Sequence, residues 1–294
     1  MKPAAFEYRA PESLEEALAL LAERPDEAKP LAGGQSLVPA MNFRLAVPAL
    51  LVDLNRVAEL DWIRESAGGG VSIGAMTRQR AVETSALVAG RAPLLSETLP
   101  HVAHPQIRNR GTLGGTVAHA DPAAEVPAAM LALGARFRAA RAGAAEGRWI
   151  EAAEFFTGLF GTALEPGELL VELEVPAAPP RTGWAFREMA RRHGDYALVG
   201  VAAGVTLDDS GRVARARIAL LSVGDAPVVA RAAESALEGE TPTAAAIEAA
   251  AAAAAGEIDP PSDIHAPAEF RRHLTRVLVG RAVSAAAARA GGSP

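Results

Sequence analysis

The stretch "QIRNRGTLGGTVAHADPAAEVPAAMLALGA", residues 106–135, places a pair of glycines directly before the hydroxyl residue Thr116. An earlier stretch, "KPLAGGQSLVPAMNFRL" at residues 29–45, has the same feature, with Gly33 and Gly34 shortly before Ser36. Because an ordered glycine loses more backbone entropy on folding than any other residue, two such pairs need a reason. The repeated pattern indicates a function that depends on exposed backbone.

Each glycine pair is expected to join a strand to the start of a helix. "KPLA" has the character of a short buried strand, and Ser36 stands where an N-cap would begin the next helical turn. Glycines in such a turn leave backbone N–H groups open, and these groups bind phosphate oxygens together with the helix dipole. One glycine pair often forms only a tight bend. Two pairs on one chain favour a ligand with two phosphates.

Composition limits the remaining function classes. The 294 residues are enough for about two domains, and acidic side chains outnumber basic ones by six, so no positive field favours nucleic acid or an anionic membrane. The amino terminus lacks an uncharged apolar core after Lys2, and no stretch approaches about 18 continuous bulky apolar residues. We therefore expect a cytoplasmic protein without a transmembrane segment.

The sequence contains no cysteine, which excludes disulfides, thiol nucleophiles and any iron–sulfur cluster held by this chain alone. The usual Rossmann and P-loop signatures and the H-E-x-x-H motif are also missing. His101, His104 and His119 lack a further partner at zinc-ligand spacing, so ordinary surface or hydrogen-bonded histidines are favoured. We predict no metal site and no catalytic residue on this chain.

Hydrophobic patterns predict the elements of the first part of the chain. Ser13 and Glu16 form a capping box for a helix, Thr77 is expected to cap another, and a third is expected to run from Pro127 to Gly134. Strands are expected at residues 6–9, 29–32, 50–55, 71–74 and 168–176.

The second part of the chain begins at Pro179 and Pro180, which mark the strongest domain boundary. Residues 196–207 and 212–224 alternate as a hairpin around the turn residues 208–211. Two helices are expected to follow, one from Thr241 and Pro242 to Gly256 and a long one over 268–290.

Four segments, in this order and spacing, carry a family resemblance: "PLAGGQSLVPAMNFRL", "SIGAMTR", "QIRNRGTLGGTVAHADPAAEVPA" and "GDYALVGVAA". They resemble the FAD-binding medium subunit of bacterial molybdenum hydroxylases, closest to the carbon monoxide dehydrogenase medium subunit within the xanthine dehydrogenase family. The resemblance implies an α+β fold of the vanillyl-alcohol-oxidase/UDP-N-acetylenolpyruvoylglucosamine-reductase (PCMH) type, with FAD between two subdomains. It also implies a carboxy-terminal domain with a three-stranded antiparallel sheet and helices. The domains would be 1–56, 57–178 and 179–294.

The resemblance also implies the residues that contact FAD. Its diphosphate would lie between two groups, namely Ala32, Gly33, Gly34, Gln35 and Ser36 on the first turn and Thr112, Gly114, Gly115 and Thr116 on the second. Lys29 would line the first turn. Valine at Gly33 or Gly114 is expected to block the approach of the diphosphate while leaving the fold largely intact. Gln35 replaces a histidine that is common in carbon monoxide dehydrogenases, so the resemblance does not specify that substrate.

Two further residues are implied near the sugar and the ring. Asp121 matches an aspartate beside the ribityl or ribose hydroxyls, and the alternative is a simple Asp-Pro turn. Tyr196 matches an aromatic residue beside the isoalloxazine ring, and the alternative is a core tyrosine at a strand edge.

In the implied complex, a small subunit holds two [2Fe–2S] clusters and a large subunit holds the molybdopterin cofactor. Electrons would reach the flavin from the clusters and leave to a quinone, NAD or oxygen, so the chain is an oxidoreductase subunit whose chemistry is that of its cofactor. Two alternatives stay open. One is a flavin-less assembly subunit, and the other is a free-standing flavin oxidase of the same fold.

Overall fold

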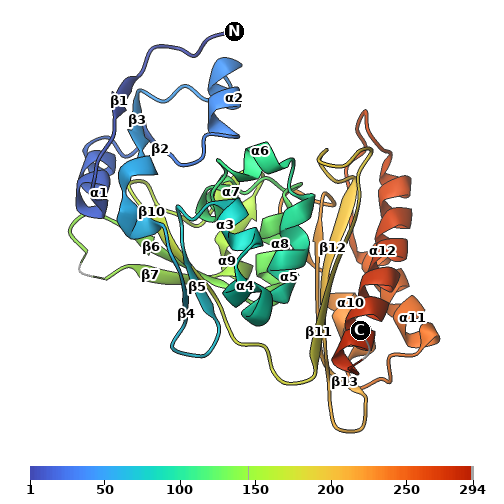
Figure 1. Ribbon diagram of the computed structural model, residues 1–294. Helices are drawn as coiled ribbons and strands as arrows, with labels where there is room; N and C mark the ends of the chain where they lie inside the picture. Colours follow the sequence, from blue (N-terminus) through green and yellow to red (C-terminus); the bar gives the residue numbers. More distant parts are fainter. Residues whose placement is uncertain (145, 293–294) are drawn as a thin grey trace.

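The computed structural model describes residues 1–144 and 146–292. The chain opens with a parallel sheet of order β1-β3-β2, formed by β1 (Glu7–Arg9), β2 (Ala28–Leu31) and β3 (Leu50–Asp53). Helix α1 (Leu14–Glu23) packs Ala17, Leu18 and Leu21 against it, and Ser13 caps this helix by accepting from the N–H of Glu16. The short helix α2 (Leu37–Asn42) follows the first glycine turn and lies apart from α1 (Figure 1).

The middle of the chain forms an antiparallel sheet of order β4-β5-β10-β6-β7 with helices packed beside it. Its strands are β4 (Ile63–Glu65), β5 (Val71–Gly74), β6 (Arg136–Ala140), β7 (Arg148–Glu151) and β10 (Leu169–Val175). The helices are α3 (Gln79–Glu83), α4 (Ala86–Arg91), α5 (Pro93–Thr98), α6 (Pro105–Arg108), α7 (Leu113–His119), α8 (Glu125–Leu133) and α9 (Ala152–Phe155). A small hairpin, β8 (Phe156–Gly158) and β9 (Gly161–Thr162), precedes β10.

The third sheet has four antiparallel strands, and the expected number of three is therefore wrong. The strands are β11 (Thr182–Met189), β12 (Val199–Leu207), β13 (Val213–Leu221) and β14 (Val228–Val229). Because β14 contains only two residues, it has no alternating pattern that a sequence analysis can detect. The expected hairpin is confirmed as β12 and β13. Helices α10 (Arg231–Leu237), α11 (Ala244–Glu257) and α12 (Ala268–Ala290) complete the chain.

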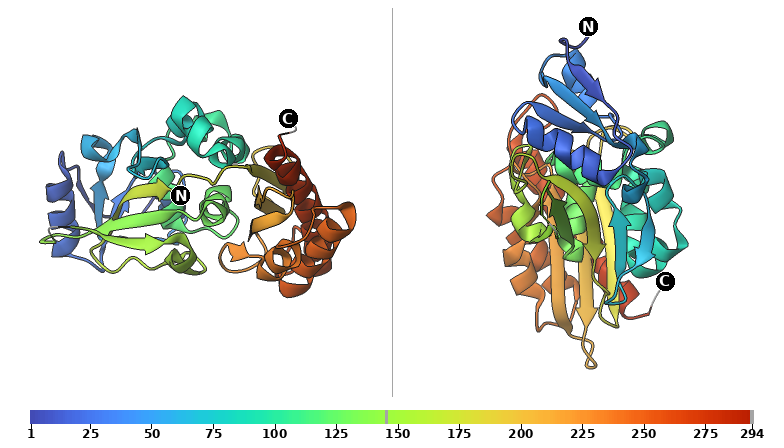
Figure 2. Two further views of the ribbon diagram at one scale, coloured as in Figure 1. Left: turned by 90° about the horizontal axis from the view of Figure 1, so that it is seen from below. Right: turned by 90° about the vertical axis from the view of Figure 1, so that its left-hand side faces the viewer.

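The carboxy-terminal sheet is covered on both faces, as Figures 1 and 2 show. Helices α5 and α8 of the middle unit pack on one face and α12 on the other. Phe186 and Ala202 belong to the core shared with the middle unit, whereas Val201 and Ala203 belong to the core under α12. This double burial explains why β12 is almost continuously apolar.

Several helix boundaries differ from the predictions. Helix α3 begins at Gln79, and the hydroxyl of Thr77 instead exchanges hydrogen bonds with the backbone of Trp62. Helix α8 begins at Glu125, so Pro127 lies inside its first turn, and Thr243 caps α11 in place of Thr241. Gly134 ends α8 with a left-handed backbone (φ 64°), as predicted. The prediction for α12 is confirmed over its full length.

Within the described residues, no helix has the length and apolarity needed to cross a membrane.

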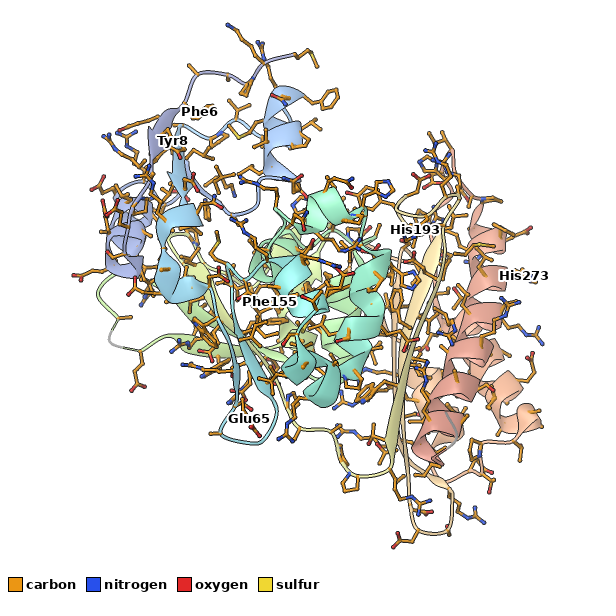
Figure 3. The ribbon with its side chains drawn as sticks, in the orientation of Figure 1. Phe6, Tyr8, Glu65, Phe155, His193 and His273 are labelled. Atoms are coloured by element: carbon orange, nitrogen blue, oxygen red, sulfur yellow. The ribbon has the colours of Figure 1, made fainter. Side chains whose placement is uncertain are left out.

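The core of the middle unit yields a first prediction. Phe137 is fully buried and packs edge-on against Phe155, with ring centroids 4.7 Å apart. Phe155 is labelled in Figure 3. Phe137→Ala is expected to lower the free energy of unfolding by about 3–5 kcal/mol, because it leaves a cavity in a packed core. Urea unfolding followed by tryptophan fluorescence measures this. The control Leu159→Ala, at a side chain that is 61% exposed, should stay within about 0.5 kcal/mol of wild type.

Candidate functional site

The two glycine turns pack directly against each other. A Cβ atom at Gly33 would overlap the carbonyl oxygen of Arg110 and the Cα atom of Gly111. A Cβ at Gly115 would lie 3.2 Å from the Cβ of Ala32. The glycines therefore allow two backbones, nearly 80 residues apart in the chain, to lie in contact. The expectation that valine at Gly33 leaves the fold largely intact is wrong, because protein atoms already occupy the space beside this residue.

A polar network links the first subdomain to the second at the same place. The Asn55 amide donates to the carbonyl of Ala32 (3.0 Å), and Arg78 donates both to the Asn55 side chain (2.6 Å) and to the carbonyl of Arg110 (2.5 Å). The Asp53 carboxylate also accepts from the hydroxyl of Tyr8 (2.5 Å), a residue that is labelled in Figure 3. Burial opposes ionisation of Asp53, but its hydrogen bonds to Tyr8 and Asn55 hold its pKa below the usual value.

The first turn presents unused backbone donors. The N–H groups of Gly33, Gly34, Gln35 and Ser36 donate to no acceptor within the described residues. Gly34 has a φ of +73°, a left-handed conformation that favours glycine. Ser36 precedes α2, but its side chain makes no capping hydrogen bond, and so the expected N-cap interaction is wrong. Successive free N–H groups of this kind form an anion-binding nest.

Gly33, Gly34 and Gln35, three of the four residues with free donors, line a hollow of about 340 Å³. Its lining includes one cationic side chain, Arg110, and no acidic one; the residues are Leu31, Ala32, Gly33, Gly34, Gln35, Val38, Pro39, Asn42 and Arg110. The predicted residue Lys29 is exposed on β2 and lies outside this lining, two residues before Leu31 on the same face of the strand. The hollow thus combines neutral backbone donors with one positive charge.

The second turn uses its donors inside the protein. The N–H of Gly114 donates to Ala75 (2.9 Å), that of Gly115 to the Thr112 hydroxyl (3.0 Å) and that of Thr116 to the Thr112 carbonyl (3.2 Å). A Cβ at Gly114 would overlap Ala75, so this glycine allows α7 to pack on the segment after β5. The two turns, which look alike in sequence, therefore differ in the backbone groups that they offer to a ligand.

Helix α7 leads from the second turn to Asp121 and Tyr196. The Asp121 carboxylate accepts from the N–H of Ala123 (2.9 Å), which forms the turn proposed as its alternative role. Ser222 donates to the carbonyls of Pro122 and Ala197 (2.8 and 2.7 Å), and these two bonds hold Asp121 and Tyr196 in the same region.

Tyr196 follows β11 in a loop, and its side chain is 66% exposed, so the alternative of a core tyrosine is wrong. Its pKa is raised, because partial desolvation and the carboxylates of Asp121 and Glu125 disfavour the phenolate. The exposed ring is available for contact with a ligand.

Sequence reasoning missed several residues near these groups. Arg78 and Arg110 lie within two of the four family segments and Asn55 lies outside them, but only folding brings the three residues together. Glu125 was missed because an acid in the first turn of a helix is ordinary. It is 6% exposed, and burial, with the carboxylates of Glu188 and Asp121, raises its pKa to about 7, which His101 partly opposes.

Comparison with known proteins identifies the class. The model described as "FAD binding domain in molybdopterin dehydrogenase" matches residues 4–178, and that described as "CO dehydrogenase flavoprotein C-terminal domain" matches residues 184–286. The chain is 46% identical over 290 residues to 6-hydroxypseudooxynicotine dehydrogenase complex subunit alpha of Paenarthrobacter nicotinovorans, covering 99% of this chain and 97% of that protein.

Solved structures agree with these matches. A chain of carbon monoxide dehydrogenase from Hydrogenophaga pseudoflava superposes with a TM-score of 0.94 at 42% identity, covering 98% of this chain and 99% of that one. A chain of quinoline 2-oxidoreductase from Pseudomonas putida 86 gives 0.92 at 44% identity, covering 99% of both chains.

Fold and matches together define an FAD-binding flavoprotein subunit of a molybdenum-containing oxidoreductase. More narrowly, the chain belongs to the family of carbon monoxide dehydrogenase medium chains, the FAD-binding medium subunits of molybdenum hydroxylases. Within the described residues, no group of three or more histidine, aspartate or glutamate side chains is placed to hold a metal ion.

The contact between the turns yields a second prediction. Gly33→Ala is expected to destabilise the chain by about 1–3 kcal/mol, because its methyl group forces the turns apart, and to weaken FAD binding at least about tenfold. Urea unfolding and FAD titration of the flavin-free chain measure the two effects. Gly68→Ala is the matched control, since a Cβ there meets nothing within 4 Å. Equal behaviour of the two variants would contradict the packing role of Gly33.

Glu125 yields a pH prediction. Because its pKa rises from 4.5 in the unfolded chain to about 7 in the folded one, its stabilising effect is complete below pH 4.5 and is lost as the pH rises through 7. At about 1.4 kcal/mol per pKa unit, the loss is about 3 kcal/mol. Glu125→Gln should remove this component of the pH dependence of unfolding between pH 4.5 and 8. Glu154→Gln, at an exposed site on α9, should keep it. A Glu125→Gln profile parallel to wild type would refute the assignment.

Proposed function

We propose that the chain binds FAD with its diphosphate over the first glycine turn and relays electrons from a partner subunit to a terminal acceptor. The observation that carries the proposal is the row of four free N–H groups at Gly33–Ser36, beside a hollow that contains a cation and no acid. Neutral donors and positive charge without a competing carboxylate suit a diphosphate.

Each predicted site residue has a role in this proposal. Gly33, Gly34, Gln35 and Ser36 bind the diphosphate through backbone N–H groups, Ala32 lines the hollow beside them, and Lys29 adds positive charge near the mouth. On the second turn, Thr112, Gly114 and Gly115 form the wall that keeps the first turn in place. The hydroxyl of Thr116 makes no hydrogen bond within the described residues and is free to reach the ligand.

At the far end of α7, Asp121 and Tyr196 are proposed to meet the sugar hydroxyls and the flavin ring. Helix α7 has seven residues and spans about 10 Å, which separates this end of the site from the glycine turns. The exposed ring of Tyr196 offers a flat apolar surface against which an aromatic ligand can pack. The cofactor would therefore extend along the helix.

The bound flavin supplies the redox chemistry, since it accepts electrons singly and releases them in pairs. The chain's own residues position it and exclude water. As the sequence has no cysteine to hold a cluster, the electrons are proposed to come from a small subunit with two [2Fe–2S] clusters, served by a large molybdopterin subunit. The acceptor would be a quinone, NAD or oxygen.

The relatives named above carry the names of different substrates, namely 6-hydroxypseudooxynicotine, carbon monoxide and quinoline. We propose that the large subunit determines the substrate. The proposed domains are 1–56, 57–178 and 179–294, a division supported by the extents of the three sheets and of the two family models. The cytoplasmic location expected from the sequence stays a prediction.

The mode of attachment yields a further prediction. No cysteine is present, and the site is built from backbone donors, so FAD should be held without a covalent bond. Precipitation of the purified flavoprotein with acid should release all of the yellow chromophore into the supernatant. Flavin that stays in the protein pellet after washing would show a covalent link and favour the free-standing oxidase.

Reconstitution tests the electron relay. The isolated FAD-loaded chain should not be reduced by the substrate of the complex, whereas addition of the small and large subunits should bleach the flavin absorbance. A small subunit in which cluster-binding cysteines are replaced by serine is the control and should not support bleaching. Reduction of the isolated chain by substrate alone would overturn the relay.

A further inference from the structure

The backbone of Arg110 is fixed where the two turns meet. Its N–H donates to the carbonyl of Ile107 (3.0 Å), and its own carbonyl accepts from the Arg78 guanidinium (2.5 Å). The same carbonyl lies against Gly33, where no Cβ fits. The Cα atom of Arg110 is therefore held beside the first turn, and Arg110 lines the hollow together with Gly33, Gly34 and Gln35.

The guanidinium of Arg110, in contrast, has no partner. It lines the hollow, is exposed, and makes no ion pair or hydrogen bond with any residue that the structure describes. Arg108, two residues earlier, is 4% exposed and forms a two-pronged ion pair with Glu83 (2.9 and 3.1 Å). Arg108 thus stabilises the fold through its ion pair with Glu83, whereas the charge of Arg110 is not neutralised by any residue that the structure describes.

The surrounding charged groups do not neutralise Arg110. The guanidinium of Arg78 is occupied by Asn55 and by the Arg110 carbonyl, and it repels a second cation. Asp53 is the nearby acid, and its carboxylate is already bound by Tyr8 and Asn55. An anionic ligand in the hollow would supply the negative charge that the Arg110 guanidinium lacks.

On this basis, and resting on the proposed function, we propose that Arg110 is the charged partner of the FAD diphosphate. The N–H groups of Gly33–Ser36 supply hydrogen bonds but no net charge, and α2 has only six residues. A guanidinium adds a full positive charge and two parallel donors that match phosphate oxygens.

The proposal also explains how ligand and fold are coupled. Arg110 belongs to the second subdomain and the free N–H groups belong to the first. A diphosphate bound to both would bridge the two subdomains beside the backbone contact that Gly33 already makes with Gly111. FAD would bind as an added link between the subdomains and stabilise their arrangement.

FAD titration of the full chain, freed of flavin, at low and at high ionic strength tests the role of Arg110. Arg110→Gln should raise the Kd for FAD about 10- to 100-fold, which is the effect of losing a hydrogen bond to a charged group. The weakening by salt should also diminish, since one charge contact is missing. ADP, added as a competitor that keeps the diphosphate, should show the same loss. Arg281→Gln, an exposed site on α12, makes the same charge change and should bind FAD like wild type.

Thermal melting of the flavin-free variants separates binding from folding. Because its side chain has no partners, Arg110→Gln should melt like wild type, and Arg110→Lys should bind FAD with intermediate affinity and retain the salt dependence. Wild-type FAD affinity in Arg110→Gln, or an equal loss in Arg281→Gln, would overturn the inference alone. A wild-type chain that binds neither FAD nor ADP would overturn the proposed function and this inference with it.

Discussion

The close backbone contact between Gly33 and the Arg110–Gly111 peptide is the constraint on which the site depends. A single methyl group at Gly33 would separate the turns, because its neighbours are main-chain atoms that cannot move aside independently. The contact brings the hollow of the first subdomain next to the guanidinium of the second. Beside this contact, the Ala32 carbonyl accepts from the Asn55 amide, and Arg78 joins Asn55 to the Arg110 carbonyl. The packing of the two turns and the position of the hollow therefore depend on the same few atoms.

The two glycine turns differ in whether their backbone N–H groups are free or hydrogen-bonded. The N–H groups of the first turn are left free, and Gly34 adopts a positive φ within this turn. Donors on the second turn are consumed by Ala75 and Thr112, so this turn acts as a rigid support. Rigid support matters, because a site whose donors are already oriented loses little further entropy when the ligand binds. Glycine thus allows close backbone packing in both turns, whereas free N–H groups are left only on the first turn.

The carboxy-terminal domain helps to fix the positions of Asp121 and Tyr196. Its sheet shares a core with α8 through Phe186, and Ser222 ties the chain near Asp121 to the loop that carries Tyr196. Burial of Glu125 at the start of α8 follows from this packing and raises its pKa. The relative position of Asp121 and Tyr196 therefore depends on contacts between domains, and a change in the third sheet would move the aromatic ring with it.

The sequence by itself determined the glycine turns, most strands, the helix over 268–290 and, through four segments, the family and its cofactor. These features are local or are carried by contiguous motifs, so a linear pattern contains them. Only the tertiary structure decided that the fourth strand Val228–Val229 exists, that the two turns differ, and that Arg110 stands at the hollow. Two residues are too few for a periodic signal, and the use of an N–H group or a guanidinium depends on which distant atoms reach it. These distant atoms come together only in the folded chain, so the spacing of residues along the sequence does not reveal which polar groups are left free.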